Sequence, residues 1–358
     1  MVRAVVFTGP DQPLQQVRFA LSETVGTAVR VRITCCTLCR SDLHTHAGRR
    51  TQLMPTILGH EIVGRIEEFG PQSLRIDARG VPVEVGDRIT WAIAVGCGTC
   101  FFCADDLPQK CEKPYKYGHE QVRLDQPIGG GLADTIVLTP NTAWFRVPDT
   151  ISDLVAAPAN CATATVAAIL RSAGSIVGRN VLVLGAGVLG LTACAMARSA
   201  GATAVFVSDP SSASRDRAMS FGATHTYSPE SGELSAGIAE VTLNRGADIV
   251  LELAGVPSSV EAGMTLTRIG GTLVLAGTVA PTARVLFDPE KIVRRMLTIR
   301  GVHNYHPRDL DTALTFLAGP GCEFPFEKLV SATYSLDNVE QAFIEAHRQP
   351  GVRIAVMP

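Results

Sequence analysis

The first 150 residues contain short runs in which apolar and polar residues alternate, such as AVRVRI at 28–33 and DRITWAIAV at 87–95. Alternation with a period of two is typical of β-strands that bury one face. Glycine and proline punctuate these runs, which indicates turns and loops between the strands. This part of the chain is therefore predicted to be a mostly β domain with functional loops.

After WFRVPD at 144–149 the pattern changes. Continuous apolar runs of strand length now alternate with alanine-rich segments of helical length. The apolar runs are VLVLG at 181–185, AVFVSD at 204–209, ADIVLELAG at 247–255 and TLVLAG at 272–277. Such βαβ alternation predicts a parallel, doubly wound sheet.

The alternation ends near residue 297, and the segment after it contains a candidate helix, NVEQAFIEAHRQ at 338–349, and a closing strand, RIAVM at 353–357. We therefore expect an α/β protein in which a Rossmann-type doubly wound sheet is inserted in a mostly β domain. The expected boundaries are 1–150 for the β domain, 151–297 for the α/β domain and 298–358 for the return to the β domain.

Composition narrows the class of protein. The chain has 358 residues, 46% of them hydrophobic, and 32 Lys and Arg stand against 34 Asp and Glu. This balance gives little support to binding of nucleic acid or of a membrane surface. No apolar run approaches the roughly 20 residues needed to span a bilayer. Because MVRAVVFTGPD at 1–11 resembles a first strand rather than a signal peptide, we expect a cytoplasmic protein.

A glycine-rich turn follows the first strand of the α/β region. VLVLGAGVLG places Gly185, Gly187 and Gly190 between an apolar strand and a helix, which is the context of a dinucleotide-binding turn. Asp209 ends the next strand, where a carboxylate accepts hydrogen bonds from the adenosine ribose. That carboxylate would repel a 2′-phosphate and so favours NAD over NADP. Arg215 and Arg217 follow it and leave open a pairing with such a phosphate.

Four cysteines cluster in the loop CGTCFFCADDLPQKC, at Cys97, Cys100, Cys103 and Cys111. Four thiolates at this spacing can surround Zn²⁺ as a closed tetrahedron, which is typical of a structural site without an open position. Two disulfides or four free thiols are the alternatives. If the zinc site is closed, the reaction must take place elsewhere in the chain.

Five motifs then occur in an order that resembles a known family. They are CRSDLH at 39–44, GHE at 59–61, the cysteine loop, NCATAT at 160–165 and the glycine-rich turn with Asp209. Together they resemble the zinc-containing alcohol dehydrogenases of the medium-chain dehydrogenase/reductase superfamily over essentially the whole chain. The resemblance implies a GroES-like fold for the β domain and two Zn²⁺ per chain, one structural and one catalytic.

The resemblance also implies roles for individual residues. The ligands of the catalytic zinc would be Cys39, His60 and Cys161, with Glu61 as a transient ligand and Asp42 orienting the His60 imidazole. Ser41 and His44 would form the proton relay. Arg40 and Arg353 would bind the cofactor pyrophosphate, and Thr165 would pack against the nicotinamide. Two alternatives stay open: Cys161 as a plain buried thiol and His44 as a solvated surface histidine.

The motif GHE occurs a second time, at 118–120. We assign the metal to the first copy, because it follows Cys39 at the family's distance and precedes an apolar strand. His119 of the second copy is expected to be a loop histidine bonded to backbone or solvent, and a role lining the substrate cleft is the alternative.

These features predict the oxidation of an alcohol to a carbonyl with hydride transfer to NAD. LPQKC, KYGHE, APANCATATVAA and GVHNY resemble the phosphonate-catabolism-associated and hydroxycamphor-type subgroup, which implies a secondary or functionalised alcohol. A zinc-free alkene or quinone reductase of the same superfamily and a non-catalytic dinucleotide sensor are the alternatives. Relatives imply a homodimer or homotetramer.

Overall fold

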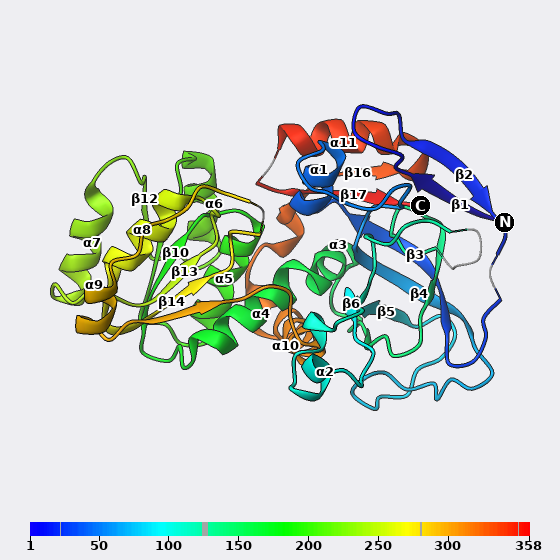
Figure 1. The fold of residues 1–358 in the computed structure, drawn as a ribbon, viewed down its shortest axis with the longest axis horizontal. Coiled ribbons are helices and arrows are strands. Elements are labelled where there is room, and N and C mark those ends of the chain that lie inside the picture. Colours follow the sequence, from blue (N-terminus) through cyan, green and yellow to red (C-terminus); the bar gives the residue numbers. More distant parts are fainter. Residues whose placement is uncertain (22, 124–127, 280, 350) are drawn as a thin grey trace. The chain divides into compact units, whose positions relative to one another are not determined.

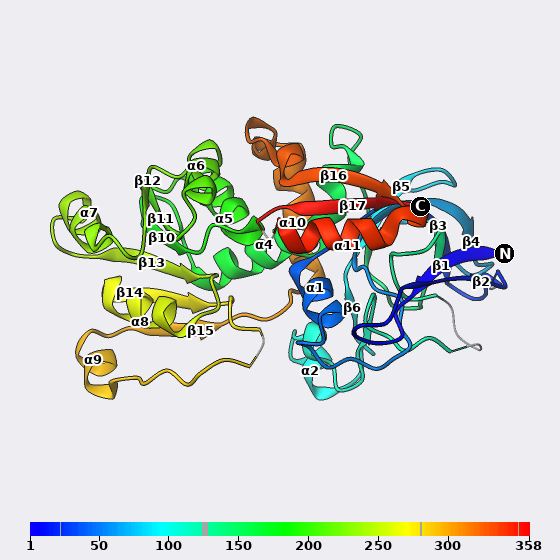
Figure 2. The ribbon, with the colours of Figure 1, turned by 90° about the horizontal axis from the view of Figure 1, so that it is seen from above.

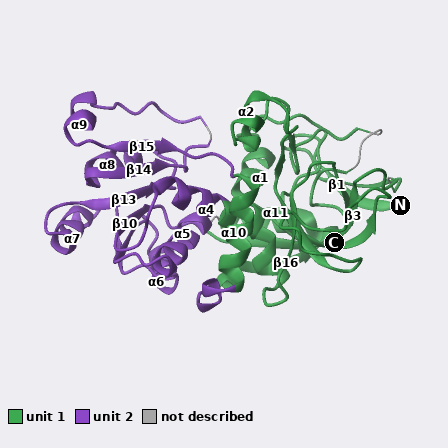
Figure 3. Ribbon diagram, turned by 90° about the horizontal axis from the view of Figure 1, so that it is seen from below, with its two compact units in different colours: residues 1–164, 306–318, 326–358 green, residues 165–305, 319–325 purple. Residues whose placement is uncertain are grey.

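The computed structural model describes residues 1–21, 23–123, 128–279, 281–349 and 351–358. The chain forms two compact units, which Figure 3 colours separately. Unit 1 comprises residues 1–164, 306–318 and 326–358, and unit 2 comprises residues 165–305 and 319–325. The α/β segment is thus inserted in the β-rich one, and the predicted fold class is confirmed.

The main sheet of unit 1 has seven strands in the order β16-β17-β3-β4-β5-β9, with β8 also paired to β3. Figure 1 labels β3, β4, β5, β16 and β17 of this sheet. Its strands are β3 (Val29–Thr37), β4 (Glu61–Phe69), β5 (Arg88–Trp91), β8 (Thr135–Leu138), β9 (Trp144–Arg146), β16 (Val330–Ser335) and β17 (Arg353–Met357). Two small hairpins pair β1 (Val2–Val6) with β2 (Gln15–Phe19), and β6 (Ala94–Val95) with β7 (Tyr115–Lys116).

Short helices connect these strands. They are α1 (Arg40–His46), α2 (Phe101–Ala104), α3 (Asp153–Ala156), α10 (Pro307–Ala318) and α11 (Val339–Arg348), with 3₁₀ turns η1 (Pro108–Lys110), η2 (Ala157–Asn160), η4 (Phe326–Leu329) and η5 (Leu336–Asn338). Figure 2 shows α11 lying along β16 and β17. Its buried residues, Val339, Ala342, Phe343 and Ala346, have the i, i+3, i+4, i+7 spacing of one helix face and join the core of the sheet.

Unit 2 contains a parallel sheet of six strands in the order β12-β11-β10-β13-β14-β15. The strands are β10 (Asn180–Leu184), β11 (Ala204–Ser208), β12 (His225–Tyr227), β13 (Ala247–Glu252), β14 (Thr267–Leu275) and β15 (Thr298–Gly301). The helices are α4 (Ala162–Ala173), which begins before the boundary, α5 (Val188–Ser199), α6 (Ser212–Ser220), α7 (Glu233–Thr242), α8 (Pro257–Leu266) and α9 (Pro289–Arg294), with the 3₁₀ turn η3 (Pro320–Glu323).

The boundaries differ from the expected ones. Strand β15 pairs with β14 in the parallel sheet, although the sequence placed residues from 298 onward in the β domain. Its residues TIRG are mostly exposed, so they lack the continuous apolar run that identified the inner strands. Unit 2 therefore continues to Tyr305, and the first boundary falls after Ala164, within α4.

Within the described residues, no single helix is long and apolar enough to cross a bilayer. The bent pair Asp153–Asn160 and Ala162–Ala173 reaches that length and composition only when its two halves are counted together.

Candidate active site

The pairing of β3 with β4 brings the first two motifs together. Thr37 at the end of β3 lies opposite Glu61 at the start of β4, so Cys39 and His60 are placed at the same end of the two strands. Cys39 is the N-cap of α1, and its backbone N–H donates to the Asp42 carboxylate over 2.9 Å. The start of α1 is thereby fixed by a side chain of its own first turn.

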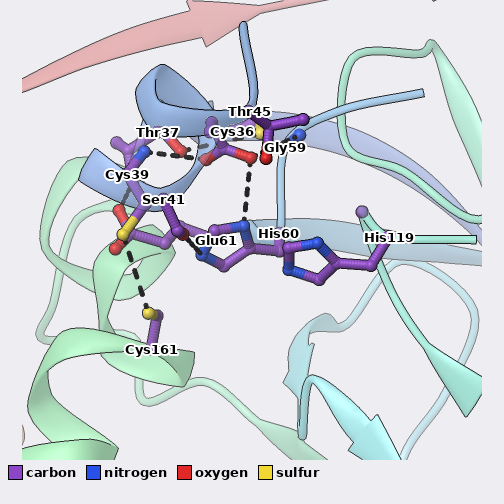
Figure 4. Close-up of polar contacts among 12 residues, drawn as sticks. Cys36, Thr37, Cys39, Ser41, Thr45, Gly59, His60, Glu61, His119 and Cys161 are labelled. Carbon is purple, nitrogen blue, oxygen red and sulfur yellow. Dashed lines mark hydrogen bonds and ion pairs between the residues drawn. The ribbon is translucent and has the colours of Figure 1, made fainter. Parts of the chain in front are cut away.

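Donor atoms of Cys39, His60, Glu61 and Cys161 all lie within 4.8 Å of one another. Figure 4 shows the sulfur of Cys39 directed at that of Cys161, and the two atoms are 3.9 Å apart. Cys161 follows η2, whose Asn160 side chain donates to the backbone oxygen of His60 over 3.1 Å. A segment a hundred residues downstream is thus tied directly to the His60 strand.

The carboxylate of Asp42 orients the imidazole of His60 by a hydrogen bond. Its Oδ1 lies 3.1 Å from His60 Nδ1 and also accepts from the Gly59 N–H over 3.2 Å. Burial lowers the pKa of His60, but the charge and hydrogen bond of Asp42 outweigh it and raise the pKa to about 10. With Nδ1 engaged by Asp42, Nε2 is left for a metal, as in the carboxylate–histidine–metal arrangement.

Glu61 is fully buried and paired with Arg353. Arg353 Nε and Nη2 donate to its two carboxylate oxygens over 2.8 and 2.9 Å, and the Thr37 hydroxyl donates over 2.6 Å. Burial raises the pKa of Glu61 to about 7, and the guanidinium opposes this rise. Arg353 was expected to bind the cofactor pyrophosphate. Two of its guanidinium nitrogens instead bond Glu61, and only Nη1 has no partner within the described part of the chain.

The two thiols of the cluster differ in acidity. The hydrogen bond from Cys161 and the charges of Arg353 and His60 lower the pKa of Cys39 well below its usual value, although burial opposes them. Cys39 is therefore the thiolate of the pair. Two sulfurs and an imidazole are the soft donor set that suits Zn²⁺. The residues present fit the metal that the sequence predicted.

The predicted relay residues lie on α1. The Ser41 hydroxyl is 3.4 Å from His60 Nε2, on the side of the ring that faces the thiols. His44 is partly exposed one turn later, and its pKa is lowered by burial and by the charges of Arg49 and Arg40. Among the described residues, no hydrogen bond joins Ser41 directly to His44. Arg40 begins the helix with an exposed side chain.

His119 lies against the metal cluster. Its ring stacks on that of His60, with centroids 5.2 Å apart (Figure 4). Its Nδ1 lies 3.0 Å from the Gln52 side-chain oxygen. A loop histidine bonded only to backbone or solvent would make neither contact. The expectation that His119 is such a histidine is therefore wrong. The amide of Gln52 is oriented by its donation to the Gly118 carbonyl, which makes Nδ1 of His119 the protonated nitrogen.

The glycines of the two GHE motifs explain this contact. Gly59 and Gly118 both have positive φ, at 87° and 73°. A Cβ at Gly118 would lie 2.7 Å from the Gly59 carbonyl oxygen and 2.9 Å from His60 Cβ. Only glycine allows the two turns to approach so closely. In the sequence, the repetition of GHE was the signal for the contact between His60 and His119. The spacing of the two copies could not show that they meet in the fold.

The cysteine loop forms the second candidate metal cluster. Sulfurs of Cys97, Cys100, Cys103 and Cys111 lie within 4.8 Å of one another, and all ten cysteines of the chain are free thiols. The two disulfides left open by the sequence are therefore not formed. Backbone and hydroxyl hydrogen bonds from Thr99 lower the pKa of Cys97 to about 6, which favours the thiolate that binds metal.

In unit 2, Gly185 leaves β10 with φ of 100°, and Gly187 is the N-cap of α5. A Cβ at Gly187 would enter open space, whereas one at Gly190 would collide with the Gly185 carbonyl. The turn is thus open where a pyrophosphate approaches and closed where helix meets strand. These glycines fit a dinucleotide.

Asp209 faces this turn from the end of β11. Its carboxylate accepts from the backbone N–H groups of Ala186 over 2.8 Å and Ser211 over 2.9 Å. The guanidinium of Arg215 donates to the backbone oxygens of Asp209 and Pro210 over 2.7 and 3.0 Å. Arg215 therefore lies beside the expected ribose site but is engaged with backbone. Thr165 lies on α4 and is partly exposed.

Comparison with known proteins agrees with this geometry. Residues 26–149 match the family model of the alcohol dehydrogenase GroES-like domain, and residues 188–319 match that of the zinc-binding dehydrogenases. The 5-exo-hydroxycamphor dehydrogenase of Pseudomonas putida is 30% identical over 87% of this chain and 86% of its own. The chain belongs to the zinc-containing alcohol dehydrogenases of the medium-chain superfamily. The resemblance drawn from the five motifs is thereby confirmed.

Other known dehydrogenases are similar over nearly the full length. The L-threonine 3-dehydrogenase of Pyrococcus furiosus is 27% identical over 95% of this chain and 94% of its own. An alcohol dehydrogenase from Thermotoga maritima has a TM-score of 0.93 at 27% identity, covering 100% of this chain and 99% of its own. A zinc-binding dehydrogenase from Sinorhizobium meliloti, solved with NADP, has a TM-score of 0.88 at 26% identity and the same coverage.

Proposed function

We propose that this dehydrogenase oxidises an alcohol to a carbonyl compound, reversibly, with NAD as hydride acceptor and zinc at the Cys39 cluster. The observation that carries the proposal is the meeting of Cys39, His60, Glu61 and Cys161 within 4.8 Å, with buried Asp42 behind the imidazole. Such an arrangement is typical of a metal site built for chemistry rather than for cross-linking.

Cys39, His60 and Cys161 would hold the metal, and Asp42 would keep His60 Nε2 directed at it. Glu61 would stay behind the site, with its charge balanced by Arg353. When bound there, Zn²⁺ supplies Lewis-acid chemistry that lowers the pKa of an alcohol. Cys97, Cys100, Cys103 and Cys111 would hold a second, structural zinc that cross-links their loop.

Ser41 and His44 would move the proton. The Ser41 hydroxyl accepts the proton of the substrate hydroxyl and donates its own onward, and the partly exposed His44 imidazole passes it to water. Burial and the nearby arginines lower the pKa of His44, which favours the neutral imidazole whose free nitrogen can accept a proton. Since no direct hydrogen bond joins the two, the relay requires a bridging group, such as a cofactor hydroxyl or a water.

The dinucleotide would bind with its pyrophosphate at Gly185, Gly187 and Gly190 and its ribose hydroxyls at Asp209. When bound there, NAD⁺ would supply the redox chemistry as the hydride acceptor. For Arg40 and Arg353, the role at the pyrophosphate rests on the resemblance to the family alone. Thr165 would pack against the nicotinamide.

The substrate is proposed to be a secondary or functionalised alcohol. The similar proteins named as 5-exo-hydroxycamphor and L-threonine dehydrogenases support this class. We also propose a homodimer or homotetramer as the working form.

A screen of primary, secondary, cyclic and phosphonate-bearing alcohols tests the proposal by following NADH formation, with metal analysis of the same preparation. We expect oxidation of at least one class and two zinc ions per chain. A zinc-free reductase would instead turn over activated alkenes with only the structural zinc. A dinucleotide sensor would bind NAD and oxidise none of the alcohols.

A further inference from the structure

Two histidines that belong to neither metal cluster meet at the ends of two helices. His46 lies in the last turn of α1, and His347 lies in the last turn of α11. These two helices are in contact within unit 1, and Figure 2 shows them next to each other. Nδ1 of His46 and Nε2 of His347 are 3.4 Å apart, and the ring centroids are 5.5 Å apart. The fold thus brings together two imidazole nitrogens that are 301 positions apart in the chain.

The ring of His46 is held in place by the core of unit 1. It stacks on Phe343 of α11, with centroids 4.5 Å apart and an angle of 21° between the ring planes, and the ring of Phe7 lies at 5.8 Å. Both phenylalanines are buried members of that core. His347, by contrast, is exposed. The pair is therefore fixed by packing on one side and can be reached from solvent on the other.

The separation of the two nitrogens suits a shared metal ion. An N–H donor and its acceptor are usually about 2.9–3.0 Å apart, so 3.4 Å is long for a hydrogen bond. Two imidazole nitrogens bound to one tetrahedral Zn²⁺, each at about 2.0–2.1 Å, would be about 3.3–3.4 Å apart. Among the described residues, neither nitrogen has another hydrogen-bond partner. When each ring carries its proton on its other nitrogen, both lone pairs are free to bind one ion.

The charges around the pair favour a cation and neutral imidazoles. The last carbonyl groups of α1 and α11 carry partial negative charge at the helix ends where the histidines lie. Burial lowers the pKa of both histidines, His347 lowers the pKa of His46 further, and Arg49 lowers that of His347. Asp11 and Glu340 act on His46 in the opposite direction and add negative charge near it. A neutral imidazole is the form that binds a metal.

We propose that His46 and His347 bind a divalent transition-metal ion, with Zn²⁺ as the reference ion, at a site that shares no residue with the two cysteine-containing clusters. Imidazole ligands suit Zn²⁺, Ni²⁺ and Cu²⁺. Within the described part of the chain no third side chain joins the pair as a ligand, so water completes the shell on the exposed side. Two protein ligands make the ion exchangeable, unlike a closed structural zinc. The ion cross-links α11 to α1, the helix that Cys39 caps, and thereby stabilises the fold.

Equilibrium dialysis of the full chain against added Zn²⁺ tests the proposal. The protein carries no histidine tag and keeps the metals with which it was purified, and the zinc gained above that starting content is measured. The wild type should gain one further ion per chain. Its melting temperature should rise with added Zn²⁺, because an ion that binds only the folded state stabilises it. Mg²⁺ at the same concentration should leave the melting temperature unchanged, since Mg²⁺ prefers oxygen ligands.

His347→Gln removes one ligand at an exposed position and leaves the core intact. We expect the dissociation constant of the added Zn²⁺ to rise at least about 10-fold and the zinc-dependent rise in melting temperature to disappear. His46→Gln should have the same effect on Zn²⁺ binding. Arg348→Gln, at the exposed neighbour of His347 on α11, is the matched control and should bind Zn²⁺ like the wild type. The melting temperature of each variant without added metal shows whether the fold is intact.

Three results would overturn the proposal. A wild type that gains no zinc above its starting content would show that the two histidines only share a hydrogen bond. Equal affinity of the wild type and His347→Gln for the added Zn²⁺ would place the ion elsewhere on the chain. An equal rise in melting temperature with Mg²⁺ would show an effect of ionic charge without coordination by imidazole. None of these measurements depends on turnover, so their failure leaves the proposed dehydrogenase function standing, and a failed alcohol screen leaves this site standing.

Discussion

Asp42 shows how one residue can organise the candidate site. Its buried carboxylate accepts from the backbone of Cys39 and of Gly59 and bonds the imidazole of His60. Asp42 thus links the two segments that carry the candidate metal ligands Cys39 and His60, and it sets the ring orientation of His60. A carboxylate that serves three partners at once is costly to replace, because each loses a buried hydrogen bond.

The two GHE motifs give a direct test at this scale. His60→Ala removes a proposed ligand of the catalytic zinc, so zinc should fall from about two to about one per chain and kcat/KM by at least about 100-fold. His119→Ala should leave zinc at about two and alter mainly the KM for the substrate, because its Nδ1 is bonded to Gln52. Metal analysis and steady-state kinetics on both variants decide the matter. Loss of zinc from His119→Ala but not from His60→Ala would reverse the assignment.

Asp77 provides a test of pH dependence away from the metals. Burial raises its pKa, but hydrogen bonds from Arg79, Arg146 and Val81 outweigh burial and hold the pKa below the ordinary value of 3.8. Since the folded pKa is lowered, the ionised carboxylate stabilises the fold above the unfolded pKa. This stabilisation is lost as the pH falls through the folded pKa.

Asp77→Asn should therefore lower the free energy of unfolding by about 3 kcal/mol at pH 7, and by progressively less below about pH 4. Urea denaturation at several pH values measures the difference between wild type and variant. Asp149→Asn, at a carboxylate that is 83% exposed and pairs with the same Arg146, should change stability by less than about 0.5 kcal/mol. A difference for Asp77→Asn that is constant from pH 7 to 3 would refute the linkage.

How far the sequence could predict the site depends on how local the contacts are. The four thiols of the cysteine loop fall within 15 residues, and the glycine-rich turn within six, so their spacing alone indicates a metal and a dinucleotide. Glu61 and Arg353 are 292 positions apart, and nothing in either local pattern announces their ion pair. Cys39, His60 and Cys161 were found only through resemblance to a family, since a three-ligand set assembled by the fold leaves no local motif.

Strands also differ in how well their sequence predicts them. The inner strands β10, β11 and β13 are buried on both faces, so their continuous apolar runs predict them. β15 lies at the edge of the same sheet with most of its residues exposed, and its pattern resembles a loop. That is why the expected end of the α/β domain at 297 fell short of Tyr305. Edge strands carry the weakest signal because only one neighbour and one face constrain them.

The β10-turn-α5 element and the end of β11 support a prediction about the cofactor. Asp209→Gly removes the carboxylate, so kcat/KM for NAD should fall and the preference for NAD over NADP should decrease about 10- to 100-fold. Because Asp209 also accepts from Ala186 and Ser211, Asp209→Asn is needed as a matched variant that can still accept one hydrogen bond. Steady-state kinetics with both dinucleotides measure the ratio. The similar protein from Sinorhizobium meliloti was solved with NADP. A wild type equally efficient with NADP and NAD would therefore assign recognition of the 2′-phosphate to Arg215 or Arg217.

At the scale of the whole molecule, unit 2 exposes a surface that one chain leaves uncovered. β15 is the last strand of its sheet and pairs only with β14 in the described chain, which leaves one edge open. Apolar side chains are exposed in the segment that leads to it: Leu286 by 92%, Val293 by 75% and Met296 by 73%. An open edge together with exposed apolar residues favours association with another chain.

We predict that a second copy covers this surface, because two identical edge strands can pair antiparallel about a twofold axis. The wild type should therefore have a mass in solution of at least twice the 38.0 kDa of one chain. The double variant Leu286→Glu/Val293→Glu places like charges in the interface and should shift the mass toward one chain, as measured by size-exclusion chromatography with light scattering. Leu74→Glu, at a leucine of unit 1 that is 80% exposed, is the control and should leave the mass unchanged. A monomeric wild type, or a double variant with the wild-type mass, would show that the β15 edge stays open.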